Sequence, residues 1–211
     1  MTAAAAATGA ATNATSNATT NATSNATTNA KSTAWNIDPA HSAAEFKVKH
    51  MMISNVKGSF GGLSGVLTEH ATDATLSHVE ATAPVATIST GDAQRDGHLK
   101  SADFFDAEKY PTLGFKSFKV VKKGEAEYDV TGDLTIRGVT KAVTFAVEGP
   151  SAPAKDPWGN TRIGLSATTK INRKDFGLSW NAALETGGFL VGEEVAITLE
   201  MEFVKAGSVN E

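Results

Sequence analysis

The chain has 211 residues, with 19 lysines and arginines, 23 aspartates and glutamates, a formal net charge of −4 and no cysteine. The acidic balance argues against a nucleic-acid-binding protein, because neutralising phosphates requires a basic face and no basic run is longer than the pair Lys122-Lys123. The missing cysteines exclude disulfide scaffolds, thiol catalysis and cysteine-ligated zinc or iron-sulfur sites.

The first thirty residues carry no charged side chain and consist mainly of alanine, threonine and asparagine. From Thr12 a four-residue unit repeats as TNAT or SNAT. A repeat without Leu, Ile, Val or Phe cannot bury enough apolar surface to offset its ordering entropy. We therefore predict a disordered low-complexity tail over residues 1–33, one folded domain over 34–206 and a short C-terminal tail over 207–211.

The sequence shows neither a secretory signal nor a membrane span. A secretory signal has a basic start and an apolar run of roughly 7 to 15 residues, and the segment 1–11 has neither. No stretch approaches the ~20 apolar residues of a transmembrane helix. We expect a cytoplasmic protein without a transmembrane segment.

Most of the remaining chain alternates between apolar and polar residues, which is the pattern of strands with one buried face. The clearest segments are 42–50, 127–137, 143–148, 163–171 and 195–203. Less regular strands are expected at 56–67, 75–83 and 112–121. Gly61-Gly62 and Gly65 indicate a bulge or strong bend in the first of these. The short turn around Gly138 predicts a hairpin, and the total is eight strands.

The segment Thr90–Ala107 interrupts this pattern. It contains residues that cap helices, including Asp92 and Ser101, and has no period-two face, so we expect one or two short helices there. Eight antiparallel strands must hide their apolar faces in a sandwich or a closed barrel, and closure also removes exposed edges. We therefore predict an all-β fold, an eight-stranded antiparallel barrel with one short helical insertion. Its inward rows mix small residues with Val, Leu and Phe, which favours a cavity over a filled interior.

The sequence contains no convincing catalytic or metal-binding motif. No two of the five histidines have the i, i+2 or i, i+4 spacing of paired ligands. The segment 62–66, GLSGV, is nearest to a nucleophile elbow but has Val66 in place of the last glycine. The other glycine-rich runs lack the Gly-Lys-Ser/Thr of a phosphate-binding loop. We expect neither catalysis, nor a metal, nor a cofactor other than a bound lipid.

Five separated blocks of sequence are specific enough to suggest a family. In chain order they are IDPAHSAAEFKVKHMMISNVKGSFGGLSG, RDGHLKSADFFDAEKYP, GDLTIRGVTKAV, DPWGNTRIG and INRKDFGL. From about Trp35 to Val204 the chain closely resembles the YceI-like family. The resemblance implies an extended lipocalin-like antiparallel barrel that holds a long isoprenoid or other amphiphilic lipid and binds it without catalysis. It also implies pairing into a homodimer, as in some members, and Gram-negative members are often exported to the periplasm.

A narrow barrel of this kind would contact a branched apolar chain through its inward side chains, with methionine filling irregular gaps. The alternative is that the same side chains simply fill a solid core. The residues expected to contact the ligand from the barrel and its loops are Phe46, Val48, His50, Met52, Phe60, Leu134, Ile136, Phe145, Ile163, Leu165, Phe176, Trp180, Ile197, Leu199 and Met201.

The helical insertion is expected to cover one end of the barrel, because it is the one extended non-strand segment rich in both charged and aromatic residues. In this hypothesis the cationic side chains hold a polar or phosphorylated head group, and the apolar ones close over the first apolar units. The residues concerned are Arg95, His98, Leu99, Lys100, Phe104 and Phe105. The rival interpretation pairs Arg95 with Asp92 or Asp96 and makes Phe104-Phe105 a plug.

Overall fold

The computed structural model describes residues 32–185 and 187–207, so residues 1–31 of the predicted N-terminal tail and 208–211 of the C-terminal tail lie outside the described residues. The strands are β1 (Ser32–Ile37), β2 (Ala43–His50), β3 (Ser54–Phe60), β4 (Ser64–His70), β5 (His78–Pro84), β6 (Thr112–Gly124), β7 (Glu127–Ile136), β8 (Val139–Glu148), β9 (Ala154–Lys155), β10 (Thr161–Asn172) and β11 (Val191–Lys205). The helical elements are α1 (Ala93–Lys100) and the 3-10 turns η1 (Ala74–Leu76), η2 (Val85–Thr87) and η3 (Arg173–Phe176).

Eight of these strands close into an antiparallel barrel. Their order around the wall is β11, β1, β4, β5, β6, β7, β8 and β10, and β10 pairs again with β11 to complete the ring. The prediction of an all-β fold, an eight-stranded antiparallel barrel with one short helical insertion, is confirmed. Closure gives each of these strands a hydrogen-bonded neighbour on both sides.

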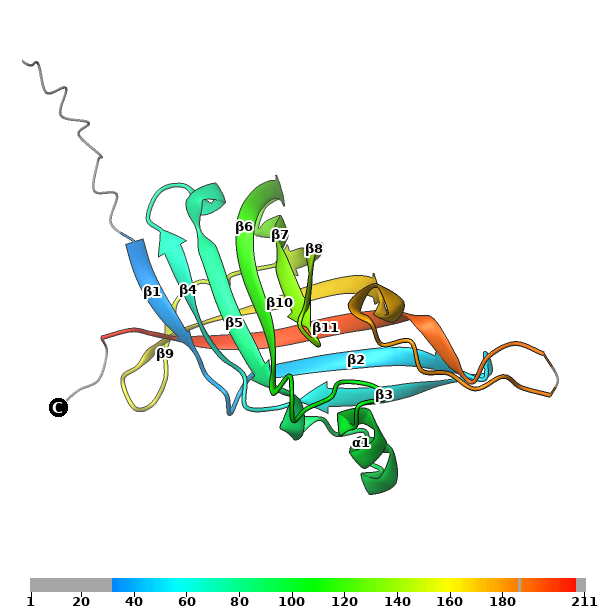
Figure 1. The fold of residues 1–211 in the computed structure, drawn as a ribbon. Coiled ribbons are helices and arrows are strands. Elements are labelled where there is room, and N and C mark those ends of the chain that lie inside the picture. Colours follow the sequence, from blue (N-terminus) through cyan, green and yellow to red (C-terminus); the bar gives the residue numbers. More distant parts are fainter. Residues whose placement is uncertain (1–31, 186, 208–211) are drawn as a thin grey trace, which may run out of the picture.

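Strands β2 and β3 form a hairpin that extends the wall along β11, toward the right of the view in Figure 1. The long strand β11 has two partners on that side, β2 along its first part and β1 along its last residues. Strand β2 pairs in turn with β3, and β1 pairs with β4. The single strand predicted over 56–67 is therefore two strands, separated at 61–63, where the glycines indicated a bend.

The predicted hairpin is formed by β7 and β8. Their register runs without interruption from Glu127 opposite Glu148 to Ile136 opposite Val139. The two turn residues, Arg137 and Gly138, have φ of 50° and 72°. Two successive left-handed residues match the right-handed twist of the flanking strands, which explains why a glycine stands at this turn.

The inward rows are those that the alternation predicted. On β7 and β8 the side chains of Leu134, Ile136, Phe145 and Val147 are buried, while Ala146 between the last two is exposed. The buried apolar side chains form three adjoining clusters along the inside of the barrel. The sequence prediction missed β1, which is short, and the two-residue strand β9.

The helical insertion packs its apolar side chains on one end of the barrel. The Asp92 side chain accepts a hydrogen bond from the Arg95 backbone N–H at 2.9 Å and so caps the start of α1, as predicted. Leu99, Phe104 and Phe105 then join the core clusters. Within the described ranges, no helix combines the length and apolar character needed to cross a membrane.

Candidate ligand cavity

The barrel encloses a cavity of about 310 Å³. Its wall consists almost entirely of apolar side chains from the inward rows of the strands and from the segment that follows α1. Polar lining groups include Glu69, Ser77 and His78, where β4 leads through η1 into β5. Pockets that hold small ligands begin at about 300 Å³ and are mainly apolar. The cavity therefore has the size and the character of a ligand site.

The cavity brings together thirteen of the residues predicted to contact a ligand. They come from four strands of the barrel wall, from the β2–β3 hairpin and from the helical insertion. They are Phe46, Val48, Phe60, Leu99, Phe104, Phe105, Leu134, Ile136, Phe145, Leu165, Ile197, Leu199 and Met201.

The other eight predicted residues lie outside the cavity wall; they are His50, Met52, Ile163, Phe176, Trp180, Arg95, His98 and Lys100. Ile163 and Phe176 are fully packed core residues, with 3% and 2% of their surface exposed. His50 ends β2, and Met52 stands at the tip of the β2–β3 turn with 70% of its surface exposed.

Within the insertion, the cationic side chains contact neighbouring protein groups. Arg95 Nε donates to Thr90 Oγ1 at 2.7 Å, so its side chain bonds Thr90 rather than either carboxylate of the rival interpretation. His98 Nε2 lies 2.9 Å from an Asp103 carboxylate oxygen, and its ring packs edge-on against Trp180. The apolar members of the insertion line the cavity, while Arg95, His98 and Lys100 stand apart from it.

Sequence reasoning missed several lining residues. Tyr128 and Val130 share the alternating row of the predicted contact Leu134, and Val195 shares that of Ile197, so the alternation alone could have added them. Phe115 of β6 was not predicted to line the cavity. The pairing of β6 with β7 shifts register between Ser117 and Lys119. That shift interrupts the two-residue period and weakens the sequence signal.

A buried arginine closes one part of the wall. Arg173, in the block INRKDFGL, has 3% of its surface exposed and lines the cavity. Its guanidinium donates to the backbone carbonyls of Leu178, Trp180 (2.9 Å), Gly192 (2.8 Å) and Val191 (3.4 Å). Burial lowers the pKa of this arginine. These hydrogen bonds hold the long connection between β10 and β11 against the barrel. They also satisfy the guanidinium donors, which explains why an arginine is tolerated in the core.

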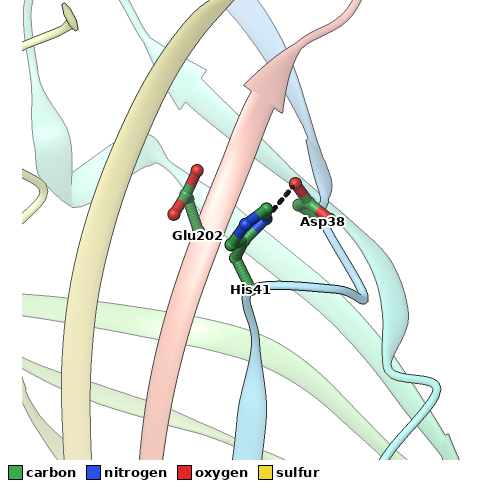
Figure 2. A group of neighbouring side chains, drawn as sticks. All are labelled: Asp38, His41 and Glu202. Carbon is green, nitrogen blue, oxygen red and sulfur yellow. Dashed lines mark hydrogen bonds and ion pairs between the residues drawn. The ribbon is translucent and has the colours of Figure 1, made fainter. Parts of the chain in front are cut away.

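A cluster of charged side chains lies at the junction of β1, β10 and β11. Asp38, His41 and Glu202 place their ligand atoms within 4.8 Å of one another, as metal ligands would (Figure 2). However, Arg162 Nη1 already donates to Asp38 at 2.5 Å and to Glu202 at 2.6 Å. The geometry is therefore that of an ion-pair network, in which the position between the two carboxylates is taken by the guanidinium.

The same arginine also binds Asp156, in the turn before β10. Arg162 Nε donates to Asp156 at 2.7 Å, which is the main reason that the pKa of this carboxyl falls to about 2. The Arg162 guanidinium, followed by His41, holds the pKa of Asp38 far below its usual range. The Arg162 guanidinium thus links the sequence blocks that contain DPAH and DPWGNTR. The ion pairs account for the charged residues of both blocks, and no bound ligand is needed to explain them.

Comparison with known proteins gives a consistent result. Residues 35–203 match the family model described as YceI-like domain. A UPF0312 protein of Staphylococcus aureus strain MSSA476 is 38% identical over 172 residues, which cover 81% of this chain and 97% of that protein.

Solved structures show the same fold. Burkholderia cenocepacia BcnA has a TM-score of 0.67 and 26% identity, over 79% of this chain and 98% of that one. The YCEI protein of Campylobacter jejuni has a TM-score of 0.62 and 33% identity, over 74% and 88%. A polyisoprenoid binding domain from Saccharophagus degradans has a TM-score of 0.60 at 16% identity, over 81% and 98%, a likeness of fold alone. Since the family model spans nearly all of the described residues, the chain belongs to the YceI-like domain family.

Proposed function

We propose that the protein binds a long-chain isoprenoid or another amphiphilic lipid inside the barrel, for storage or transport, without catalysis. The observation that carries this proposal is the cavity, which is apolar along almost its whole wall and is lined by strands of the barrel and by the β2–β3 hairpin. The description of the Saccharophagus degradans relative as a polyisoprenoid binding domain supports the same class of ligand.

The energetics suit a ligand of this kind. Each buried methylene group contributes about 0.8 kcal/mol, so about ten of them give about 8 kcal/mol, the free energy of a micromolar Kd. Aromatic and branched side chains line most of the wall, and they contact branched isoprene units without requiring one fixed pose. The cytoplasmic location, the head-group role of Arg95, His98 and Lys100, and the homodimer stay predictions.

The test is whether a lipid accompanies the purified protein. Native mass spectrometry followed by solvent extraction should show a lipid released from the barrel. Leu199→Trp should displace it, because this side chain lines the cavity. Thr198→Trp, one residue away on the opposite face of β11, is the matched control and should retain the lipid.

A second variant covers the case in which Leu199→Trp does not fold. Ala44→Val adds a smaller volume to the same cavity wall and should reduce the extracted lipid. If the purified barrel contains no lipid and does not bind added isoprenoid alcohols, the alternative of a structural or interaction module is favoured. Release of a chemically altered lipid would instead point to an enzyme.

A further inference from the structure

The tip of the β2–β3 hairpin exposes large apolar side chains to solvent. Met52 and Ile53 have 70% and 80% of their surface exposed, and Met51 has 39%. The turn lies against the loop before β11, since the Met51 backbone N–H donates to the Leu190 carbonyl at 2.8 Å. The preceding residue of that loop, Phe189, is 56% exposed. We call Met51, Met52, Ile53 and Phe189 the apolar tip.

The backbone of the turn makes its composition unusual. Met51 and Met52 have φ of 51° and 59°, both in the left-handed region. Turns of this kind favour asparagine and glycine, because a side chain at positive φ is strained. Two methionines therefore occupy positions where small polar residues would be more stable and more soluble. The backbone strain at these two positions places apolar side chains in solvent, and strain of this kind indicates a functional role for those side chains.

The hairpin is also basic, although the whole chain has a net charge of −4. Residues 43–60 contain three lysines, Lys47, Lys49 and Lys57, against Glu45 as the only carboxylate. Lys47 stands directly opposite Lys57 in the strand pairing. In the described part of the chain, none of the three has a carboxylate within 4.0 Å.

The nearest carboxylates on β11 do not neutralise these lysines. Glu193 pairs with Lys174 at 2.5 Å and Glu194 with Lys170 at 2.9 Å. The outer face of the hairpin thus carries unpaired positive charge directly beside the apolar tip. Apolar side chains flanked by lysines are typical of segments that lie in the interface of an anionic membrane.

We propose that the β2–β3 hairpin docks the protein on the surface of an anionic membrane. The apolar tip enters the head-group region, and Lys47, Lys49 and Lys57 face the anionic head groups. A contact between two copies of the hairpin fits less well, because it would bring like charges together and lysine is depleted in protein interfaces. Docking does not depend on what fills the barrel, although Phe46 and Val48 of the same hairpin line the cavity.

Vesicle co-sedimentation of the full-length protein tests the proposal. The protein should bind vesicles containing phosphatidylglycerol and phosphatidylcholine, and binding should weaken strongly on phosphatidylcholine alone or in high salt. Met52→Ser with Ile53→Ser should remove most of the binding. Lys47→Gln with Lys57→Gln should reduce the affinity by roughly fivefold per lysine.

Matched controls lie elsewhere on the surface. Leu76→Ser with Phe118→Ser removes two apolar side chains that are each 60% exposed but do not belong to the hairpin. Lys119→Gln with Lys122→Gln removes two exposed lysines of β6. Both double variants should bind anionic vesicles as the parent does. Equal loss in the controls, or no loss in the hairpin variants, would overturn the proposal.

A fluorescent dye attached at the apolar tip reports whether the tip enters the membrane, which a binding affinity alone does not show. Because the chain has no cysteine, Met52→Cys creates a unique site for an environment-sensitive dye, and Leu76→Cys creates its control. A blue shift at residue 52 on adding anionic vesicles supports insertion. A blue shift that instead increases with protein concentration in the absence of vesicles would show self-association and contradict the proposal. Vesicle binding and extracted lipid are separate measurements, so either proposal can fail alone.

Discussion

Arg162 on β10 donates a hydrogen bond to Asp38, which stands 124 positions earlier in the chain, at an N–O distance of 2.5 Å. The same guanidinium reaches Asp156 and Glu202. One cation therefore joins the segment after β1, the turn before β10 and strand β11. The pairs are partly buried, with 19% of the Arg162 side chain exposed, so they are screened less by solvent than surface pairs.

The first prediction follows from this network and concerns acid stability. The pKa values of Asp38 and Asp156 are lowered in the folded protein, the second to about 2, from an ordinary value of 3.8. Between about pH 4 and pH 2 the unfolded chain takes up protons while the folded chain does not, so stability falls as pH falls. We expect Arg162→Met to make this decline shallower and to lower stability at neutral pH.

Urea unfolding at several pH values from 2 to 5 measures both effects. The control is Lys116→Met, which removes the highly exposed pair with Glu80. It should change stability at neutral pH by no more than about 1 kcal/mol. An unchanged pH dependence in Arg162→Met would show that other carboxylates govern acid unfolding.

The second prediction concerns the buried arginine. Arg173→Met keeps an unbranched apolar stem but removes the donors to four backbone carbonyls. Hydrogen bonds to a charged group contribute about 1.5–3 kcal/mol each, so we expect a loss of at least 3 kcal/mol. The adjacent change Lys174→Met removes an exposed pair with Glu193 and a contact of 5.9 Å with the centroid of the exposed Phe189 ring, and it should be nearly neutral. Similar chemical denaturation midpoints for the two variants would contradict this role.

The third prediction compares Gly61, in the bend between β3 and β4, with Gly65, at the start of β4. Gly65 has φ of 153°, and a Cβ there would lie 2.1 Å from the Glu80 carbonyl oxygen. Gly65→Ala should therefore destabilise the barrel by about 3 kcal/mol, since both backbones must move apart. Gly61→Ala meets nothing within 4 Å and should shift the melting temperature by no more than a degree or two. A mild effect at Gly65 would mean that β4 and β5 approach less closely.

The fourth prediction separates structure from binding in the insertion. His98 bonds Asp103 and packs on Phe104 and Trp180, so His98→Ala should lower the melting temperature and leave the affinity for an isoprenoid alcohol unchanged. Phe105→Ala, which opens the cavity wall, should lower both. Calorimetry and lipid titration measure the two quantities. Lost affinity for an isoprenoid phosphate at unchanged stability would support the predicted head-group role of His98.

Local sequence determined which residues form strands and which way their side chains face. The two-residue alternation predicts inward rows through Leu134, Phe145 and Met201, and all three side chains are buried. Gly138 likewise predicts the β7–β8 turn, and the capping residues Asp92 and Ser101 predict the helical insertion. These features follow from neighbouring residues alone, since strand pleat and helix caps depend on sequence separations of two to four residues.

Tertiary structure decided which inward residues face a cavity and which fill the core. Ile163 and Leu165 stand in one row of β10, yet Leu165 lines the cavity and Ile163 is packed solid. The contacts of His98 with Trp180 and of Arg162 with Asp38 likewise join segments far apart in the chain. Such contacts depend on the register of strand pairing and on how the ring closes, which no local pattern encodes.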